Sequence, residues 1–132
     1  MLTVDGSVLC CGENDNNELG RNGKRSVMQR MDAVEAFSII DMAVGDGFCI
    51  LLSKDGRMIS WGQNSFGQLG CGDREPKEKP KPNSFSTELR LLKVCAGSQH
   101  VLALARNGQV LTWGANRYHF RQSSSIYVCM LT

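Results

Sequence analysis

The 132-residue sequence has no run of about 18 apolar residues, the length that a helix needs to cross a bilayer. Its first residues, MLTVDGSVLCCGENDN, lack the basic start and the long apolar stretch of a secretory signal. These two absences predict a protein of the cytoplasm or nucleus that neither spans a membrane nor is secreted. In that reducing environment we expect the six cysteines to remain free thiols.

The sequence also lacks the patterns of catalytic and metal sites. No C-x-x-C pair occurs, and Cys10 and Cys11 would point to opposite faces of a strand, which is poor geometry for a shared metal ion. Ser98 and His100 stand in G-S-Q-H, which is not the turn that presents a catalytic serine. We therefore predict no catalytic, cofactor-binding or metal-binding residue, no cofactor, and no enzyme activity in this chain.

Signals for nucleic acid and nucleotides are missing too. A net charge of +2 is too weak to predict a nucleic-acid surface. The stretch WGQNSFGQLGCG, residues 61–72, is glycine-rich, but Gln68 and Leu69 follow Gly67 where a phosphate loop needs Lys and Ser or Thr. We expect these glycines to serve positive φ angles and close strand packing instead.

What the sequence does contain is an internal repeat. Three segments align: DGSVLCCGENDNNELG from Asp5, DGRMISWGQNSFGQLG from Asp55 and NGQVLTWGANRY from Asn107. The preceding segments IDMAVGDGFCILLSKDG from Ile40 and LKVCAGSQHVLALARNG from Leu92 also align without gaps. The equivalent glycines at 6, 56 and 108 give a period of about 50 residues, which is typical of propeller blades and solenoids.

Each repeat is predicted to form antiparallel strands. Lys-Asp-Gly at 54–56 and Arg-Asn-Gly at 106–108 are hairpin signals, because Asp-Gly and Asn-Gly accept the positive φ of a tight turn. The flanking apolar runs predict paired strands, and a third strand is expected before each hairpin. The expected strands cover residues 39–44, 48–53, 57–61, 91–96, 100–105 and 109–113. A turn of helix is expected within residues 31–37.

About seventeen residues of the middle copy and the segment after it fit one consensus at fixed spacing: Gly56, Trp61, Gly62, Asn64, Gly67, Gln68, Leu69, Gly70, Gly72, Val94, Ala96, Gly97, His100, Leu102, Ala103, Leu104 and Gly108. This pattern closely resembles the repeat of the regulator of chromosome condensation family. The resemblance implies an all-β fold, a propeller of about seven four-stranded blades, and a frequent role as a docking platform. It implies architecture rather than activity.

The chain departs from the family pattern at several positions. Cys11 replaces the expected Trp, Glu18 replaces Gln, and Phe48 stands where His100 stands in the next copy. After Tyr118 the expected G-Q-L-G is missing, as in a truncated gene model, an alternative exon or a shifted frame. We therefore divide the chain into repeats over residues 1–118, with boundaries near 6, 56 and 108, and an aberrant non-repeat tail over 119–132.

The resemblance covers about two and a half repeats, whereas a closed propeller needs at least about four blades. We therefore predict a partial β-propeller of consecutive antiparallel blades. Apolar faces and strand edges would remain unpaired, so the chain is expected to be marginally stable alone and able to self-associate through open blade edges.

Two histidines and two carboxylate pairs are candidate functional residues with simpler interpretations. His100 adjoins an apolar strand and is expected to be satisfied by local hydrogen bonds, and His119 has no Cys or His partner at ligand spacing. The pairs Glu13/Asp15 and Asp73/Glu75 are expected to be solvated loop charges.

The segment CGDREPKEKPKP, residues 71–82, and the repeated tryptophans are candidate contact sites. Its three prolines predict an extended, exposed linker between strands, which could contact a partner but is more simply a solvated loop. Exposed tryptophans would mark an interface. Because Trp61 and Trp113 occupy the same repeat position, we expect them to pack between blades.

These observations predict a protein-interaction module, built from propeller repeats and part of a larger regulatory protein. The expected partner is another protein, with a small GTPase as one possibility and nucleic acid disfavoured. The resemblance implies two alternatives: a fragment of a guanine-nucleotide exchange factor, whose chemistry is binding and needs no acid or base, and the substrate-binding propeller of a large ubiquitin ligase.

Overall fold

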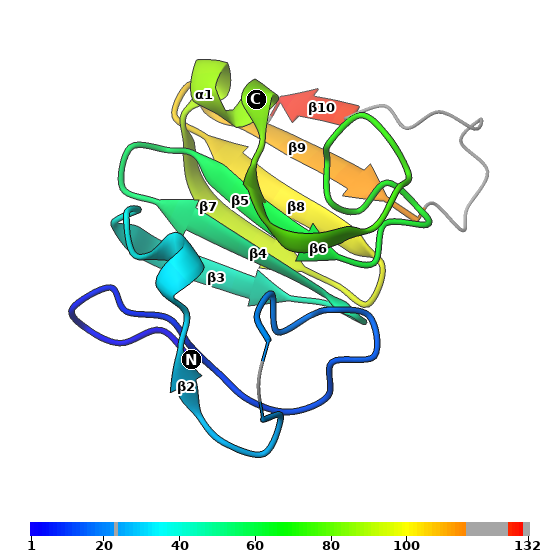
Figure 1. Cartoon of the computed structure of the whole chain (residues 1–132). Helices are drawn as coiled ribbons and strands as arrows, with labels where there is room; N and C mark the ends of the chain where they lie inside the picture. Colours follow the sequence, from blue (N-terminus) through cyan, green and yellow to red (C-terminus); the bar gives the residue numbers. More distant parts are fainter. Residues whose placement is uncertain (23, 116–126, 131–132) are drawn as a thin grey trace.

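The computed structural model describes residues 1–22, 24–115 and 127–130, and it is a stack of β-sheets (Figure 1). The first unit, within residues 1–38, holds a two-stranded ribbon and a 3-10 turn: β1 (Leu9–Cys10), β2 (Gln29–Arg30) and η1 (Asp32–Val34). The middle blade follows, with strand order β3 (Ile39–Val44), β4 (Phe48–Ser53), β5 (Met58–Gly62) and β6 (Lys77–Pro82). After α1 (Ser84–Leu89) comes the last blade: β7 (Leu91–Ala96), β8 (His100–Ala105), β9 (Gln109–Gly114) and β10 (Tyr127–Met130). The predicted all-β partial propeller of antiparallel blades is confirmed.

The hairpins form where the turn signals predicted them. Gly56 and Gly108 have φ of +85° and +86°, a backbone conformation that favours glycine. Ser53 Oγ donates to the Asp55 carboxylate, and Gln109 N donates to Asn107 Oδ1 at 3.1 Å, so the side chain before each glycine also fixes the turn.

Matching registers show that the sequence repeat is a structural repeat. Phe48 pairs with Gly62 in the middle blade, and His100 pairs with Gly114 in the last. The first strand of each blade also has a register shift at the same place, between Ile39 and Asp41 in β3 and between Leu91 and Lys93 in β7. A residue in one blade can therefore be compared directly with its counterpart in the next.

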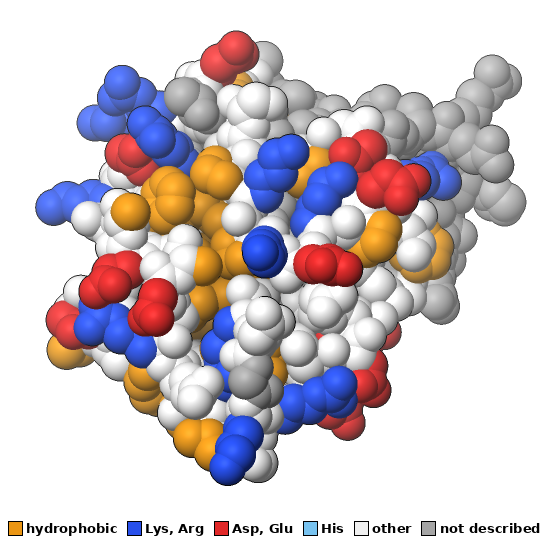
Figure 2. All heavy atoms as spheres, in the orientation of Figure 1, with side chains coloured by type: hydrophobic (Ala, Val, Ile, Leu, Met, Phe, Trp, Pro, Cys, Tyr) orange, Lys and Arg blue, Asp and Glu red, His pale blue; other side chains and the backbone are white. Residues whose placement is uncertain are grey.

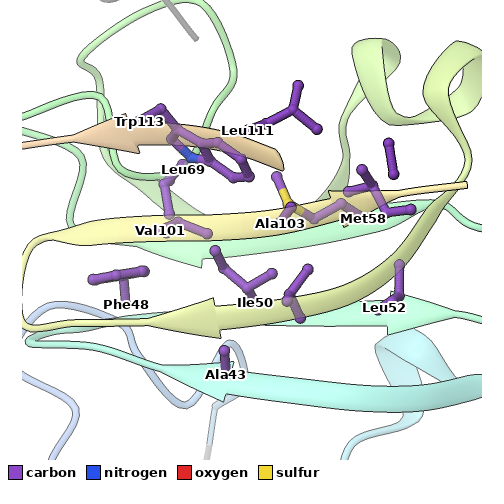
Figure 3. Packing of buried hydrophobic residues seen from close by; sticks show 13 residues of the cluster. Ala43, Phe48, Ile50, Leu52, Met58, Leu69, Val101, Ala103, Leu111 and Trp113 are labelled. Carbon is purple, nitrogen blue, oxygen red and sulfur yellow. The ribbon is translucent and has the colours of Figure 1, made fainter. Parts of the chain in front are cut away.

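The blades stack face to face, with an apolar core at each junction. The core between the middle and last blades contains residues from both sheets (Figure 3): Ala43, Phe48, Ile50, Leu52, Met58, Leu69, Leu91, Val94, Val101, Ala103, Ala105, Leu111 and Trp113. The core between the first unit and the middle blade contains Val8, Met31, Val34, Ile39, Leu51, Ile59 and Trp61. Each sheet is thus held by its neighbours in the stack.

The structure corrects the expectation of a linker over residues 71–82. The second half of that segment is strand β6, which pairs with β5 through Ser60↔Lys81 and Gly62↔Lys77. Proline cannot donate to a strand ladder, so it fits only where its nitrogen faces away from the neighbouring strand. Pro80 and Pro82 meet this condition because β6 is the outer edge of its sheet.

The remaining segments give mixed outcomes. The turn η1 lies within residues 31–37, as predicted, whereas the six-residue helix α1 was not predicted. Strand β10 lies in the segment set apart as a tail and pairs with β9 as β6 pairs with β5. The division at residue 118 stays a prediction, because the break itself and His119 lie outside the described residues.

Candidate interaction surfaces

The repeated tryptophans join successive blades. Trp61 Nε1 donates to the carbonyl of Glu18 at 2.8 Å, and Trp113 Nε1 donates to the carbonyl of Gln68 at 2.8 Å. Glu18 and Gln68 are equivalent positions, so the same hydrogen bond recurs one blade later. Both tryptophans are buried, at 2% and 4% exposure, which confirms the expected packing between blades and excludes them as exposed contact residues.

The glycine-rich loop of the middle blade uses its polar groups internally. Asn64 Oδ1 accepts from Leu69 N, and Asn64 Nδ2 donates to the carbonyls of Asp73 and Glu75. The backbone amides of Gly67 and Gly70 donate to carbonyls within the loop. A phosphate cradle needs such amides free to face the anion. The loop is therefore a structural element, as the sequence predicted.

Asp73 lies on a loop with 43% of its side chain exposed, in keeping with the expected solvated charge, and it also has local hydrogen-bond partners. Its carboxylate accepts from Lys77 Nζ at 2.9 Å, from Asn64 Nδ2 and from Glu75 N. The hydrogen bond from Lys77 is the main cause that lowers the pKa of Asp73. Sequence spacing alone did not indicate this role, because it depends on the loop returning towards Asn64.

Asp15 behaves as expected for a surface charge. It bonds Arg25 at 2.7 Å, and both side chains are more than half exposed. An exposed pair of this kind contributes little to stability.

His100 also differs from its prediction. The imidazole is exposed, lies over Gly97, and makes no hydrogen bond within the described part of the chain. Its counterpart Phe48 lies over Gly45 in the same way but is completely buried. The two positions differ in exposure because the last blade packs over Phe48, whereas no described residue covers His100.

The difference extends across a whole sheet face, here called the open face, which consists of Lys93, Cys95, His100, Leu102, Leu104, Val110 and Thr112. Five of the seven equivalent residues of the middle blade, Phe48, Ile50, Leu52, Met58 and Ser60, are at 0% exposure. The other two counterparts, Ala43 and Asp41, are buried at 8% exposure and half-buried, respectively. On the open face, by contrast, Leu102 is 43% exposed and Cys95 is also exposed. The open face is therefore a blade-packing surface without its partner blade in the described structure.

The face shown in Figure 2 carries mixed charge. Charged side chains of both signs are interspersed over the face shown in Figure 2. Among the described residues, no group of three or more His, Cys, Asp or Glu side chains is placed to hold a metal ion, and no helix is long and apolar enough to cross a membrane.

The cysteines differ in their surroundings. Cys49 lies between the first unit and the middle blade, and burial raises the pKa of its thiol to about 12. Cys11 and Cys95 are exposed. Reactivity towards alkylating reagents needs the thiolate, so the raised pKa of Cys49 slows its alkylation.

The repeat geometry has a counterpart in known proteins. The sequence profile of the regulator of chromosome condensation (RCC1) repeat matches residues 5–52 and 55–104, and a second profile of the same repeat matches residues 39–68 and 92–119. The chain belongs to the RCC1 repeat family. The Trp61 and Trp113 contacts between blades are thus features of an RCC1-repeat stack.

Curated relatives of this RCC1-repeat chain are much longer proteins. The chain is 31% identical over 121 residues to the probable E3 ubiquitin-protein ligase HERC6 of Homo sapiens, covering 89% of this chain and 12% of that protein. It is 31% identical over 113 residues to the ultraviolet-B receptor UVR8 of Arabidopsis thaliana, covering 84% of this chain and 26% of that receptor. The chain therefore spans only a small part of these relatives.

Solved structures show the same fold. Human WBSCR16 superimposes with a TM-score of 0.78 at 21% identity, over 96% of this chain and 34% of that one. Prp20p from Saccharomyces cerevisiae, studied with its binding properties to Gsp1p and histones, gives a TM-score of 0.70 at 26% identity, over 86% of this chain and 27% of that one.

Proposed function

We propose that this chain is a protein-interaction module, an open RCC1-type propeller segment of a larger regulatory protein that binds other proteins and has no catalytic step of its own. The open face carries this proposal. Five of its seven residues occupy positions that are fully buried one blade earlier, and an exposed sheet face with aliphatic residues of this kind typically marks a protein-binding surface. Cytoplasm or nucleus is the location we propose for this role.

We assign self-association to the open face rather than to the edge of β6. Strand β6 carries Pro80, Pro82 and three lysines, and both residue types protect strand edges against pairing with another chain. The sequence-based expectation of pairing through open blade edges stays a prediction.

Leu102 is the residue through which this function is tested. Replacing it by Lys should abolish binding at the open face, because the charge replaces the most exposed aliphatic side chain of that face. Stability should change by no more than about 1 kcal/mol, since the side chain is 43% exposed. The matched control is Val27→Lys, on the first unit, where the side chain is 44% exposed.

The chain is made with a benzophenone amino acid at position 102 or 27 and photo-cross-linked to its partner in cells. The captured partner is then purified, and its binding to the chain is measured by calorimetry. We expect one partner protein to be captured from position 102 and not from position 27. This partner should bind the purified wild-type chain and should not bind the Leu102→Lys variant. Equal capture from both positions, or binding that survives Leu102→Lys, would contradict the proposal.

A second candidate, guanine-nucleotide exchange on a small GTPase, is favoured by the likeness to Prp20p, which was studied for its binding to Gsp1p. It is tested by release of fluorescent GDP from purified small GTPases. Acceleration by this chain would support exchange activity, whereas binding without acceleration supports the plain interaction module. The third candidate, a substrate-binding propeller of a ubiquitin ligase, is favoured by the HERC6 likeness and predicts that the bound protein is ubiquitinated by the longer parent.

A further inference from the structure

Two aliphatic side chains, Ile40 and Leu92, are exposed at equivalent positions of neighbouring blades. In β3, Ile39 and Asp41 pair with consecutive residues of β4, so Ile40 has no partner residue on that strand, as in a β-bulge. The register shift of β7 leaves Leu92 in the same situation. Ile40 is 50% exposed and Leu92 is 49% exposed, whereas the residues before them are buried at 4% and 2% exposure. Each blade thus exposes one aliphatic side chain at its bulge.

A neighbouring blade does not cover this position. Ile40 remains exposed although the last blade packs on one face of its sheet and the first unit packs on the other. Leu92 remains exposed although the complete middle blade packs against β7. The two strands lie side by side, with Asp41 Oδ2 accepting from Val94 N at 3.4 Å. The exposure of this pair is therefore a property of the repeated blade rather than of the number of blades.

Cationic side chains lie beside the pair, at the end of the blades where the hairpin turns and α1 are found (Figure 1). Lys54 N donates to the carbonyl of Ser38 at 2.8 Å, and Arg106 N donates to the carbonyl of Arg90 at 3.0 Å. These equivalent hydrogen bonds place the first residue of each turn beside the residue two positions before the bulge. The side chains of Lys54, Arg90 and Arg106 are exposed and make no ion pair or hydrogen bond with any residue that the structure describes.

The excess of positive charge lies on the side of Leu92. In α1 and the last blade, three cationic residues stand against one acidic residue at this end, a net charge of about +2: Arg90, Lys93 and Arg106 against Glu88. The same end of the middle blade is balanced, with two residues of each sign: Lys54, Arg57, Asp41 and Asp55. The first unit adds one net negative charge where it shares a hollow with Lys54, from Asp5, Glu35 and Arg30. An anionic ligand is therefore attracted to the surface around Leu92.

Arg90 has an unusual backbone conformation for an arginine. It ends α1 with φ of +48°, in the left-handed region where glycine is the usual residue at the end of a helix. Non-glycine residues held in this region are enriched at binding sites, where the conformation fixes the position of a side chain. The strained arginine and the unpaired Arg106 thus point to the same surface as the two bulges.

We propose that Ile40, Leu92, Arg90 and Arg106 form a docking site for a protein segment that carries aliphatic side chains together with Asp or Glu. The aliphatic side chains of the segment cover the two bulge residues, and its carboxylates pair with the two arginines. The planar guanidinium group suits this role because it donates two hydrogen bonds to one carboxylate. A nucleic acid fits less well, because it brings no aliphatic side chain to cover Ile40 and Leu92. The site is separate from the open face that carries the proposed function.

The test selects short random peptides, displayed on phage, that bind the wild-type full chain. The selected peptides are then sorted on two variants of matched chemistry, Leu92→Ser at the proposed site and Leu102→Ser on the open face. Both side chains are about half exposed, at 49% and 43%, so both variants should keep the wild-type urea midpoint. We expect a set of peptides that bind the wild type and Leu102→Ser but not Leu92→Ser, and that combine aliphatic residues with Asp or Glu.

Charge reversal tests the acidic part of the ligand. Arg106→Glu should weaken binding of a selected peptide at least about tenfold, and added salt should weaken binding to the wild type. Arg74→Glu is the matched control and should leave binding unchanged, because Arg74 is exposed on the loop at the opposite end of the middle blade.

Three results would overturn the site. The first is that no peptide distinguishes Leu92→Ser from the wild type. The second is that the peptides lost with Leu92→Ser lack Asp and Glu, or bind Arg106→Glu as tightly as the wild type. The third is that the same peptides are also lost with Leu102→Ser, which would merge the site with the open face. Loss of this site with intact binding at Leu102 would remove this inference and leave the proposed function standing.

Discussion

Trp113→Ala should lower the free energy of unfolding by about 3–5 kcal/mol, as expected when a large aromatic side chain is removed from a core. The indole is 4% exposed and packs in the core between the middle and last blades. The same substitution leaves the carbonyl of Gln68 without the indole donor. Domains of this size are typically stable by about 5–15 kcal/mol, so much of the folded population is expected to be lost.

Urea unfolding followed by circular dichroism measures this effect. Trp113→Phe is the control, because it keeps a large aromatic ring and removes the hydrogen bond to Gln68, a contribution of about 0.5–1.5 kcal/mol. A Trp113→Ala protein that unfolds at the wild-type midpoint but fails to bind its partner would instead place this tryptophan at an interface.

Gly62→Ala should also be strongly destabilising, because two separate constraints meet at this glycine. Its φ is +101°, and an added Cβ would lie 2.3 Å from the carbonyl oxygen of Gly47 and 2.8 Å from Phe48 Cα. These are backbone atoms, and the Gly47 oxygen also accepts from Gln63 N at 2.7 Å, so moving it breaks a hydrogen bond. Gly114 repeats the arrangement one blade later, with the oxygen of Gln99 at 2.4 Å.

Gly72→Ala separates the two constraints. Gly72 has φ of +80° but no atom within 4 Å of an added Cβ. Its alanine variant should lose only the conformational part, about 1–2 kcal/mol, and Gly62→Ala should lose about 1–3 kcal/mol more. The two losses of unfolding free energy are compared through the denaturant midpoints of the two variants. Equal losses in Gly62→Ala and Gly72→Ala would mean that close strand packing at Gly62 is not important.

The local structure of the blades was predictable because it is encoded by neighbouring residues. The Asp55-Gly56 and Asn107-Gly108 turns and the apolar runs beside them placed six of the central strands within one residue of their observed bounds: β3, β4, β5, β7, β8 and β9. Strand β6 was missed because its prolines and lysines are typical of a loop. They are acceptable in a strand only at a sheet edge, and edge position is a property of the folded sheet.

The exposure of candidate residues could not be predicted from the repeat alone. His100 and Phe48 occupy equivalent positions, yet one is exposed and the other buried, because burial depends on the next blade in the stack. The sequence shows that the chain holds about two and a half repeats. Which side chains are left exposed as a result is known only from the registers of the sheets.

Alkylation of matched cysteines tests the central claim, which is that the middle blade is covered and the open face is not. Cys95 is exposed on the open face, and its counterpart Ala43, at 8% exposure, faces the last blade. Rates are measured by mass spectrometry on the wild-type chain and on Ala43→Cys, with half-buried Cys49, whose thiol pKa is raised, as a slow-reacting reference. The account predicts rapid labelling of Cys95 and slow labelling at position 43 until the protein unfolds. Equal rates at both positions would contradict the stacked blades with one open face.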